Sequence, residues 1–134
     1  MSLLDVTDLQ TTFITDDGRV GAVDGVSFAV ERGQVLGIVG ESGCGKSVTM
    51  LSIMRLLSEK SSTTEGQVLF EGDDLLQMPN RQMQQIRGSA MAMIFQDPMT
   101  SLNPVYRVGW QLVEALRLHD SSISKAAARD RAVE

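Results

Sequence analysis

The sequence has little cysteine, little proline and no long apolar run. Cys44 is its single cysteine, which excludes an internal disulfide and a metal site made of several cysteines, and fits a reducing compartment. The 134 residues include 12 glycines and three prolines and are 43% hydrophobic, which excludes a collagenous or disordered chain. A chain of this length holds one globular domain at most.

Membrane-spanning segments and an excess of basic charge are also missing. The apolar run at residues 90–95 is much shorter than the ~20 residues that cross a bilayer. Residues 1–5 contain no basic side chain, so we expect neither a transmembrane segment nor a secretion signal. Twelve basic and 17 acidic side chains give a net charge of −5, which argues against a nucleic-acid partner. A phosphate-bearing ligand must therefore be bound locally.

The apolar pattern predicts strands of two kinds. Extended stretches at residues 3–15 and 20–30 flank Asp16-Asp17-Gly18, which is typical of an antiparallel hairpin. The short apolar runs at residues 34–39 and 90–96 predict strands buried on both faces of a parallel sheet. Residues 67–70 predict a further strand.

The remaining segments predict helices and loops. Residues 46–57 are apolar nearly all round a helix, which predicts a buried one. Helices are also predicted at residues 79–87, before the stop at Gly88, at 105–116, with an amphipathic pattern, and at 124–134. The polar stretches at 58–66 and 97–104 predict loops.

A glycine-rich motif lies between the predicted strand at 34–39 and the predicted helix at 46–57. It matches G-x-x-x-x-G-K-[ST] and consists of Gly40, Glu41, Ser42, Gly43, Cys44, Gly45, Lys46 and Ser47, which we call the phosphate loop. Its glycines let backbone N–H groups and the positive end of the next helix point at phosphates. Lys46 adds a charge for the β and γ phosphates, and the Ser47 hydroxyl suits Mg²⁺. The motif predicts a nucleoside triphosphate site that ends at Val48; a glycine-rich turn without a ligand is the alternative.

The single cysteine lies inside this loop. A position near a helix N-terminus and Lys46 favours the thiolate form of Cys44 and therefore its reactivity. The alternative is a sulfur that turns into the core and only fills space.

In the order of its segments, the sequence resembles the ATP-binding subunits of ABC transporters. The segments that carry the resemblance are residues 9–13, 22–28, Gly33, the phosphate loop, 66–68 and 94–98. The run Phe95-Gln96-Asp97-Pro98-Met99-Thr100-Ser101-Leu102-Asn103-Pro104 is similar to the subfamily that serves oligopeptide, dipeptide and nickel importers. The resemblance covers about residues 3–118, which is less than half of a typical member.

The resemblance implies an α/β fold, a P-loop NTPase of the ABC type that stops before the second half of its core. It divides residues 1–134 into an antiparallel β entry at 1–33, a P-loop core up to the Q-loop at 34–97, and the start of a helical subdomain at 98–134.

The resemblance also assigns roles to single residues. Phe13 corresponds to the aromatic that stacks on adenine; a core aromatic is the alternative. Gln96 corresponds to the glutamine that reaches Mg²⁺ and the attacking water, and the loop after it contacts the membrane subunits; a polar strand end is the alternative. Lys46 and Gln96 are thus the predicted catalytic residues, and Ser47 and Gln96 the predicted metal ligands. Without the resemblance, Asp97 would be a candidate metal ligand.

The implied function is an ATPase that uses ATP and Mg²⁺ to drive import of peptides or nickel. Its implied partners are permease subunits, a second ATP-binding subunit and, indirectly, a solute-binding protein, at the cytoplasmic face of the plasma membrane. A nucleotide-binding fragment without turnover and a small P-loop metabolite kinase are the alternatives. The stretches at 3–15 and 20–30, before the phosphate loop, argue against the kinase.

Several family motifs are missing from the sequence after Gln96. It contains no Leu-Ser-Gly-Gly-Gln signature, no apolar strand that ends in Asp-Glu and no switch histidine, since His119 is predicted to be a solvated helix residue. Phosphoryl transfer lacks stabilising groups without them. We therefore expect the 134 residues alone to be incompetent for hydrolysis and only marginally stable, because the strand at 34–39 would lack neighbours.

Overall fold

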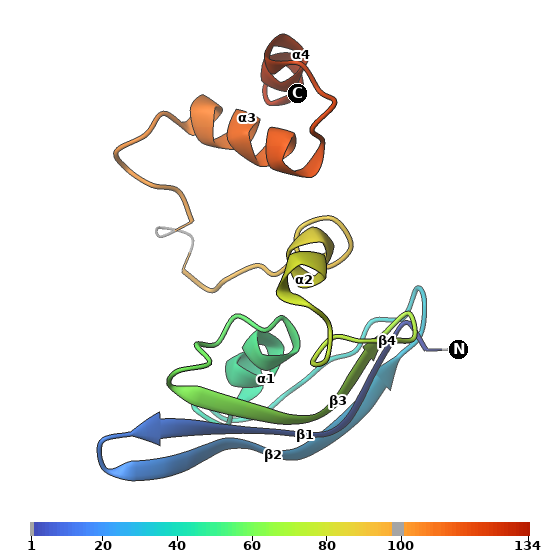
Figure 1. Ribbon diagram of the computed structural model, residues 1–134, viewed down its shortest axis with the longest axis vertical. Helices are drawn as coiled ribbons and strands as arrows, with labels where there is room; N and C mark the ends of the chain where they lie inside the picture. Colours follow the sequence, from blue (N-terminus) through green and yellow to red (C-terminus); the bar gives the residue numbers. More distant parts are fainter. Residues whose placement is uncertain (1, 98–100) are drawn as a thin grey trace. The chain divides into compact units, whose positions relative to one another are not determined.

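The computed structural model describes residues 2–97 and 101–134. It divides into two compact units, Met1–Met83 and Gln84–Glu134, which Figure 1 shows in blue to green and in yellow to red. Pro98, Met99 and Thr100, which the sequence places in a loop, lie outside the described residues.

The first unit is built on a four-stranded antiparallel sheet with the order β2-β1-β3-β4. The strands are β1 (Leu4–Thr15), β2 (Gly18–Val30), β3 (Ser62–Phe70) and β4 (Asp73–Asp74). The predicted hairpin of β1 and β2 is confirmed, with Thr15 opposite Gly18, whose φ of 127° suits glycine. Buried side chains from β1 and β3, including Val6, Leu9 and Val68, form the core of this unit.

β3 begins earlier than the sequence predicts. Residues 62–66 are polar and were expected in a loop, yet Ser62 pairs with Phe13 and Glu65 with Gln10 of β1. Backbone pairing with β1 satisfies the N–H and C=O groups of this stretch whatever its side chains are. The Ser62 hydroxyl is buried and donates to the Ser58 carbonyl, 2.9 Å away.

Helix α1 (Lys46–Ile53) packs against the sheet of the first unit (Figure 1). It is shorter than the predicted helix and buried on one face only, through Thr49, Ser52 and Ile53. The helix stops because Arg55 adopts a left-handed conformation with φ 51°, which side chains rarely allow within a helix. After the helix ends, the Arg55 guanidinium donates hydrogen bonds to the backbone carbonyls of Leu75 and Met78.

The two strands predicted to be buried on both faces are not formed. In residues 34–39, Val35 and Val39 are each 93% exposed. In residues 90–96, Met91 makes an isolated bridge with Arg87, and Ile94 is 97% exposed. A strand needs hydrogen-bonded neighbours, and among the described residues the sheet strands pair only with one another. Apolar composition alone therefore predicted the environment of these segments incorrectly.

The helices of the second half lie close to their predicted places. α2 (Asn80–Ile86) crosses the boundary between the units, and α3 (Val108–His119) and α4 (Lys125–Arg131) belong to the second. Gly88 follows α2 with φ 85°, as a helix stop requires. The Ser124 hydroxyl caps α4 by accepting from the Ala127 N–H.

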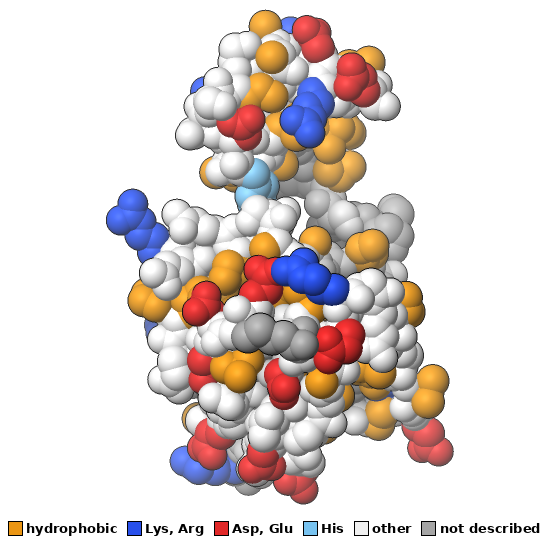
Figure 2. Space-filling model, turned by 90° about the vertical axis from the view of Figure 1, so that its right-hand side faces the viewer, with side chains coloured by type: hydrophobic (Ala, Val, Ile, Leu, Met, Phe, Trp, Pro, Cys, Tyr) orange, Lys and Arg blue, Asp and Glu red, His pale blue; other side chains and the backbone are white. Residues whose placement is uncertain are grey.

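The described part of the second unit buries few side chains. α3 has no buried residue, and Ala128 of α4 is the one side chain of this unit's described part that is buried. Hydrophobic side chains instead reach the surface, where Figure 2 shows them in orange between charged groups. Within the described part of the chain, every helix is too short or too polar to cross a bilayer.

Candidate nucleotide-binding site

The phosphate loop wraps the start of α1. Gly43 and Gly45 adopt φ values of 82° and 94°, which are open to glycine and costly for other residues. Gly45 precedes the first helical residue, and no side chain caps the helix there. The free N–H groups and the dipole of this helix start favour an anion. The glycines of the loop thus adopt left-handed backbone conformations at the start of α1, and the binding of phosphate by this loop stays a prediction.

The backbone of β2 touches the loop at Gly45. A Cβ built on Gly45 would lie 2.4 Å from the carbonyl oxygen of Ala22, so any side chain there would collide with backbone. The strand pairing skips Ala22, because Thr11 faces Val23 and Thr12 faces Gly21. Ala22 is thus a bulge residue that directs its carbonyl to the loop. The sequence carries no pattern that marks the bulge, so this contact was not predicted.

The Lys46 side chain turns back over the loop. Its Nζ atom donates to the carbonyl oxygens of Gly40 and Glu41, at 2.7 and 2.6 Å, and lies 3.3 Å from the Cys44 Sγ atom. A Cβ on Gly40 would lie 2.6 Å from that sulfur and 3.7 Å from Nζ. Because Gly40 has no side chain, the Lys46 ammonium and the Cys44 thiol can lie side by side next to it.

The other loop residues lie at the surface. Glu41, Ser42, Cys44 and Ser47 are exposed, and Val48 is half-buried in the first turn of α1. Exposure of the free Cys44 thiol beside Lys46 contradicts the alternative in which the sulfur turns into the core.

A buried hydroxyl pair holds α1 on the sheet. Thr11 Oγ1 and Ser52 Oγ lie 2.7 Å apart, and Ser52 also donates to the Val48 carbonyl. Because side chains alternate along a strand, Phe13 lies on the same face of β1 as Thr11, the face that carries α1. Phe13 is half-buried and pairs with Val20 and Ser62. Its role in binding adenine stays a prediction.

Gln96 and Asp97 belong to the second unit, whereas the phosphate loop belongs to the first. Both are exposed and lie in an irregular segment. The structure describes each unit by itself, so a metal role for either residue stays a prediction.

His119 is exposed at the end of α3, as predicted. Its ring lies against Gly88, where a Cβ would be 2.5 Å from Nε2. Next to it, hydrogen bonds from the Ser122 hydroxyl and N–H lower the pKa of Asp120. The Gly88 contact was not predicted.

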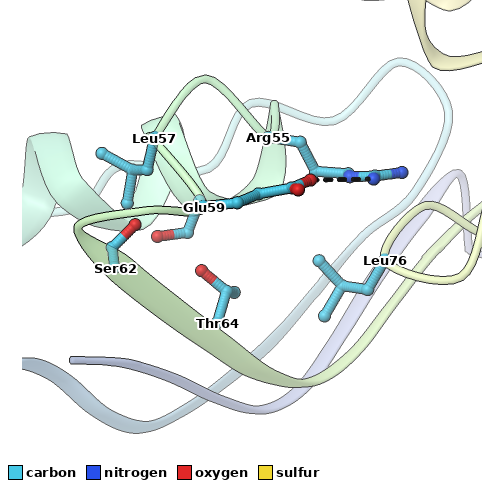
Figure 3. Close-up of a pocket in the computed structure, with 7 residues that line it drawn as sticks. Arg55, Leu57, Glu59, Ser62, Thr64 and Leu76 are labelled. Carbon is cyan, nitrogen blue, oxygen red and sulfur yellow. Dashed lines mark ion pairs between the residues drawn. The ribbon is translucent and has the colours of Figure 1, made fainter. Parts of the chain in front are cut away.

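The first unit also holds a cavity of about 140 Å³. Figure 3 shows Ser62 and Thr64 of β3 on one side of this cavity, with Glu59 and Leu76 also among its lining residues. Arg55 lines it too, but its guanidinium is 3.8 Å from Glu59 and donates to two backbone carbonyls. None of the predicted site residues line this cavity.

Comparisons with known proteins place the chain in a family. The family described as ABC transporter matches residues 23–133. The chain is 53% identical over 133 residues to a "Probable peptide ABC transporter ATP-binding protein" of Sinorhizobium fredii, covering 98% of this chain and 39% of the relative. It is 50% identical over 133 residues to an "Oligopeptide transport ATP-binding protein" of Bacillus subtilis, with 98% and 37% covered. The chain thus spans about two fifths of the length of these relatives.

Solved structures agree on the fold. A dimeric ATP-binding cassette in a post-hydrolysis state with ADP and Pi matches with a TM-score of 0.77 at 21% identity, covering 97% of this chain and 54% of that chain. This likeness confirms the predicted α/β fold of the ABC type, with an antiparallel β part at the N-terminus. Because the family match covers most of the sequence, we conclude that the chain belongs to the ABC transporter family.

Proposed function

We propose that this chain is part of an ATP-binding subunit that couples ATP binding and hydrolysis to the import of peptides across the cytoplasmic membrane. The observation that carries the proposal is the Lys46 ammonium held inside a glycine loop at the start of α1. The names of the relatives favour peptides as cargo. Nickel is the alternative cargo of the subfamily that the sequence resembles.

Different residues would bind different parts of the nucleotide. Lys46 exchanges its contacts with the Gly40 and Glu41 carbonyls for the β and γ phosphates, and loop N–H groups from Glu41 to Val48 bind phosphate oxygens. Phe13, on the α1 face of β1, stacks on adenine. Binding is therefore strongest for a ligand with both a base and a polyphosphate.

The loop also fits Mg²⁺, which prefers oxygen ligands and keeps several waters beside phosphates. Ser47 offers an exposed hydroxyl directly after Lys46, and Gln96 offers an amide oxygen. When bound, the ion would neutralise charge on the phosphates. Gln96 would hold the attacking water, while Lys46 holds the transferred phosphoryl group.

The proposed partners follow from the family. A second ATP-binding subunit would pair with this one, as the dimeric solved cassettes do. Permease subunits would contact the loop after Gln96, and a solute-binding protein would act through them. The subunit would then lie at the cytoplasmic face of the membrane.

Calorimetric titration with Mg-ATP tests the proposal on the 134-residue chain. Lys46→Ala removes charge-assisted phosphate contacts of about 1.5–3 kcal/mol, so affinity should fall by one to two decades. Lys60→Ala is the matched control, because Lys60 is an exposed lysine outside the loop. Equal affinities for wild type and Lys46→Ala would refute the nucleotide site.

Turnover is expected only when the missing family motifs are supplied. The chain alone should hydrolyse ATP no faster than Lys46→Ala, because a positioned carboxylate base and the signature motif are absent from its sequence. A colorimetric phosphate assay measures this. A Lys46-dependent rate from the short chain would contradict the expectation that hydrolysis needs the missing motifs, and would make Asp97 the first candidate base. A fragment that binds without turnover, the second candidate function, predicts no rate even after the C-terminal half is restored.

A further inference from the structure

One side chain of α3 bonds to the loop that precedes the helix. The Gln111 amide donates through Nε2 to the carbonyl oxygens of Asn103 and Tyr106, at 2.9 and 3.0 Å. Its Oε1 atom accepts from the Asn103 N–H at 2.8 Å. A backbone N–H can only donate and a carbonyl can only accept, so these partners fix the orientation of the amide. Gln111 therefore closes the loop onto α3 with three hydrogen bonds.

Residues 103–106 of this loop form a turn with hydrogen bonds of its own. The Asn103 side chain accepts from the Val105 N–H at 2.9 Å, and the Tyr106 N–H donates to the Asn103 carbonyl at 3.3 Å. This is the local pattern of an asparagine turn. Four residues thus take one shape between Asn103 and the start of α3.

Apolar side chains stand on the outside of this turn. Val105 is 83% exposed, and the rings of Tyr106 and Trp110 stack with centroids 4.8 Å apart and planes 26° apart. The described part of this unit buries one side chain, Ala128, so no core holds the turn. Its shape must come from the hydrogen bonds and the ring stack.

We propose that Gln111 is a positioning residue, whose single amide sets the shape of residues 103–106 and so the placement of Val105 and of Tyr106 against Trp110 of α3. Glutamine combines the required reach with both donors and an acceptor: Asn is shorter, ionised Glu has no donor, and Met has no donor and only a weakly accepting sulfur. The link to transport rests on the proposed function, in which the loop after Gln96 meets a permease subunit. A turn already in its bound shape lowers the ordering cost of such a contact.

The first test measures the turn directly in the full 134-residue chain. Gln111→Met keeps length and helix propensity but removes all three bonds; Gln85→Met, at an exposed position of α2, is the matched control. Amide exchange by NMR should show the Asn103 N–H exchanging roughly tenfold faster in Gln111→Met, because it loses its acceptor. Exchange equal to that of the control would overturn the proposal.

A spectroscopic signature separates positioning from general destabilisation. The chain has one Trp and one Tyr, so the long-wavelength part of the near-ultraviolet circular dichroism, where phenylalanine does not absorb, reports on the stacked pair. In Gln111→Met this signal should fall and Trp110 emission shift to longer wavelength, with the far-ultraviolet spectrum and Mg-ATP affinity unchanged. A retained aromatic signal would overturn the proposal, because the ring stack would then hold without Gln111.

An uptake assay separates this proposal from the proposed function. In cells whose importer carries the complete subunit, Gln111→Met should lower peptide uptake several-fold and Lys46→Ala should abolish it. Normal uptake in Lys46→Ala would refute the proposed function, while the exchange of the Asn103 amide would still decide the role of Gln111. Normal uptake in Gln111→Met alone would refute its link to transport.

Discussion

The two units of this chain differ in the interactions that stabilise each of them internally. In the first, strands pair along their length, and Leu9, Val6 and Val68 are buried side chains of its core. In the second, helices and turns are held by local hydrogen bonds, and Ala128 is the buried side chain of the described part. Apolar residues are common in both, so the difference lies in whether hydrogen-bonded neighbours give them a surface to pack against.

The largest expected effect is on stability and compares one leucine from each unit. Leu9→Ala removes a fully buried side chain of β1 and should lower the free energy of unfolding by about 2–5 kcal/mol. Leu118→Ala truncates a side chain that is 78% exposed on α3, and its effect should stay within about 0.5 kcal/mol. Urea unfolding followed by circular dichroism measures both. Similar losses would mean that the second unit has a core of its own.

The next largest effect separates two glycines of the phosphate loop. Gly45→Ala must hold a left-handed conformation and displace the Ala22 carbonyl, so roughly 2–4 kcal/mol of stability should be lost. Gly43→Ala faces the same conformational cost, about 1–2 kcal/mol, but meets no atom within 4 Å. The same urea series decides the comparison. Equal losses would show that contact with β2 adds nothing to the position of the loop.

The smallest expected effect is the protection of Cys44 from chemical labelling when Mg-ATP is bound. Cys44 is exposed beside Lys46, so a maleimide should modify it, and Mg-ATP at ten times its dissociation constant should slow modification about tenfold. Mass spectrometry reads the result without ambiguity, because the chain has one cysteine. The control is Ser121→Cys in a Cys44→Ser background, which places a thiol in the second unit. If bound Mg-ATP slows neither thiol, the ligand lies away from Cys44.

Local signals explain what the sequence could predict. The β1–β2 hairpin follows from Asp16-Asp17-Gly18, the end of α2 from Gly88, and the phosphate loop from its spacing of glycines, because each depends on a few neighbouring residues. The strands expected at 34–39 and 90–96 were wrong, since burial on two faces depends on neighbours elsewhere. The start of β3 was missed because polar side chains do not reveal backbone pairing.

The candidate site shows the same limit. Its loop residues could be named from the motif, but the bulge at Ala22 and the Thr11–Ser52 pair could not. In the second unit, the hydrogen bonds of the Gln111 amide could not be predicted either. Each joins positions whose contact exists only once the chain has folded. Residue types with several possible partners, such as Ser, Thr and Gln, do not specify which partner they will find.

The bulge at Ala22 limits where this chain can be lengthened. Residues added between Asp16 and Gly18 would extend the turn and leave the bulge opposite Gly45. A single residue added between Gly18 and Ala22 would instead shift the register of β2 and turn its side chains to the other face. A peptide tag or fluorescent label placed at the hairpin turn should therefore preserve the phosphate loop, whereas one placed a few residues later along β2 should disrupt it.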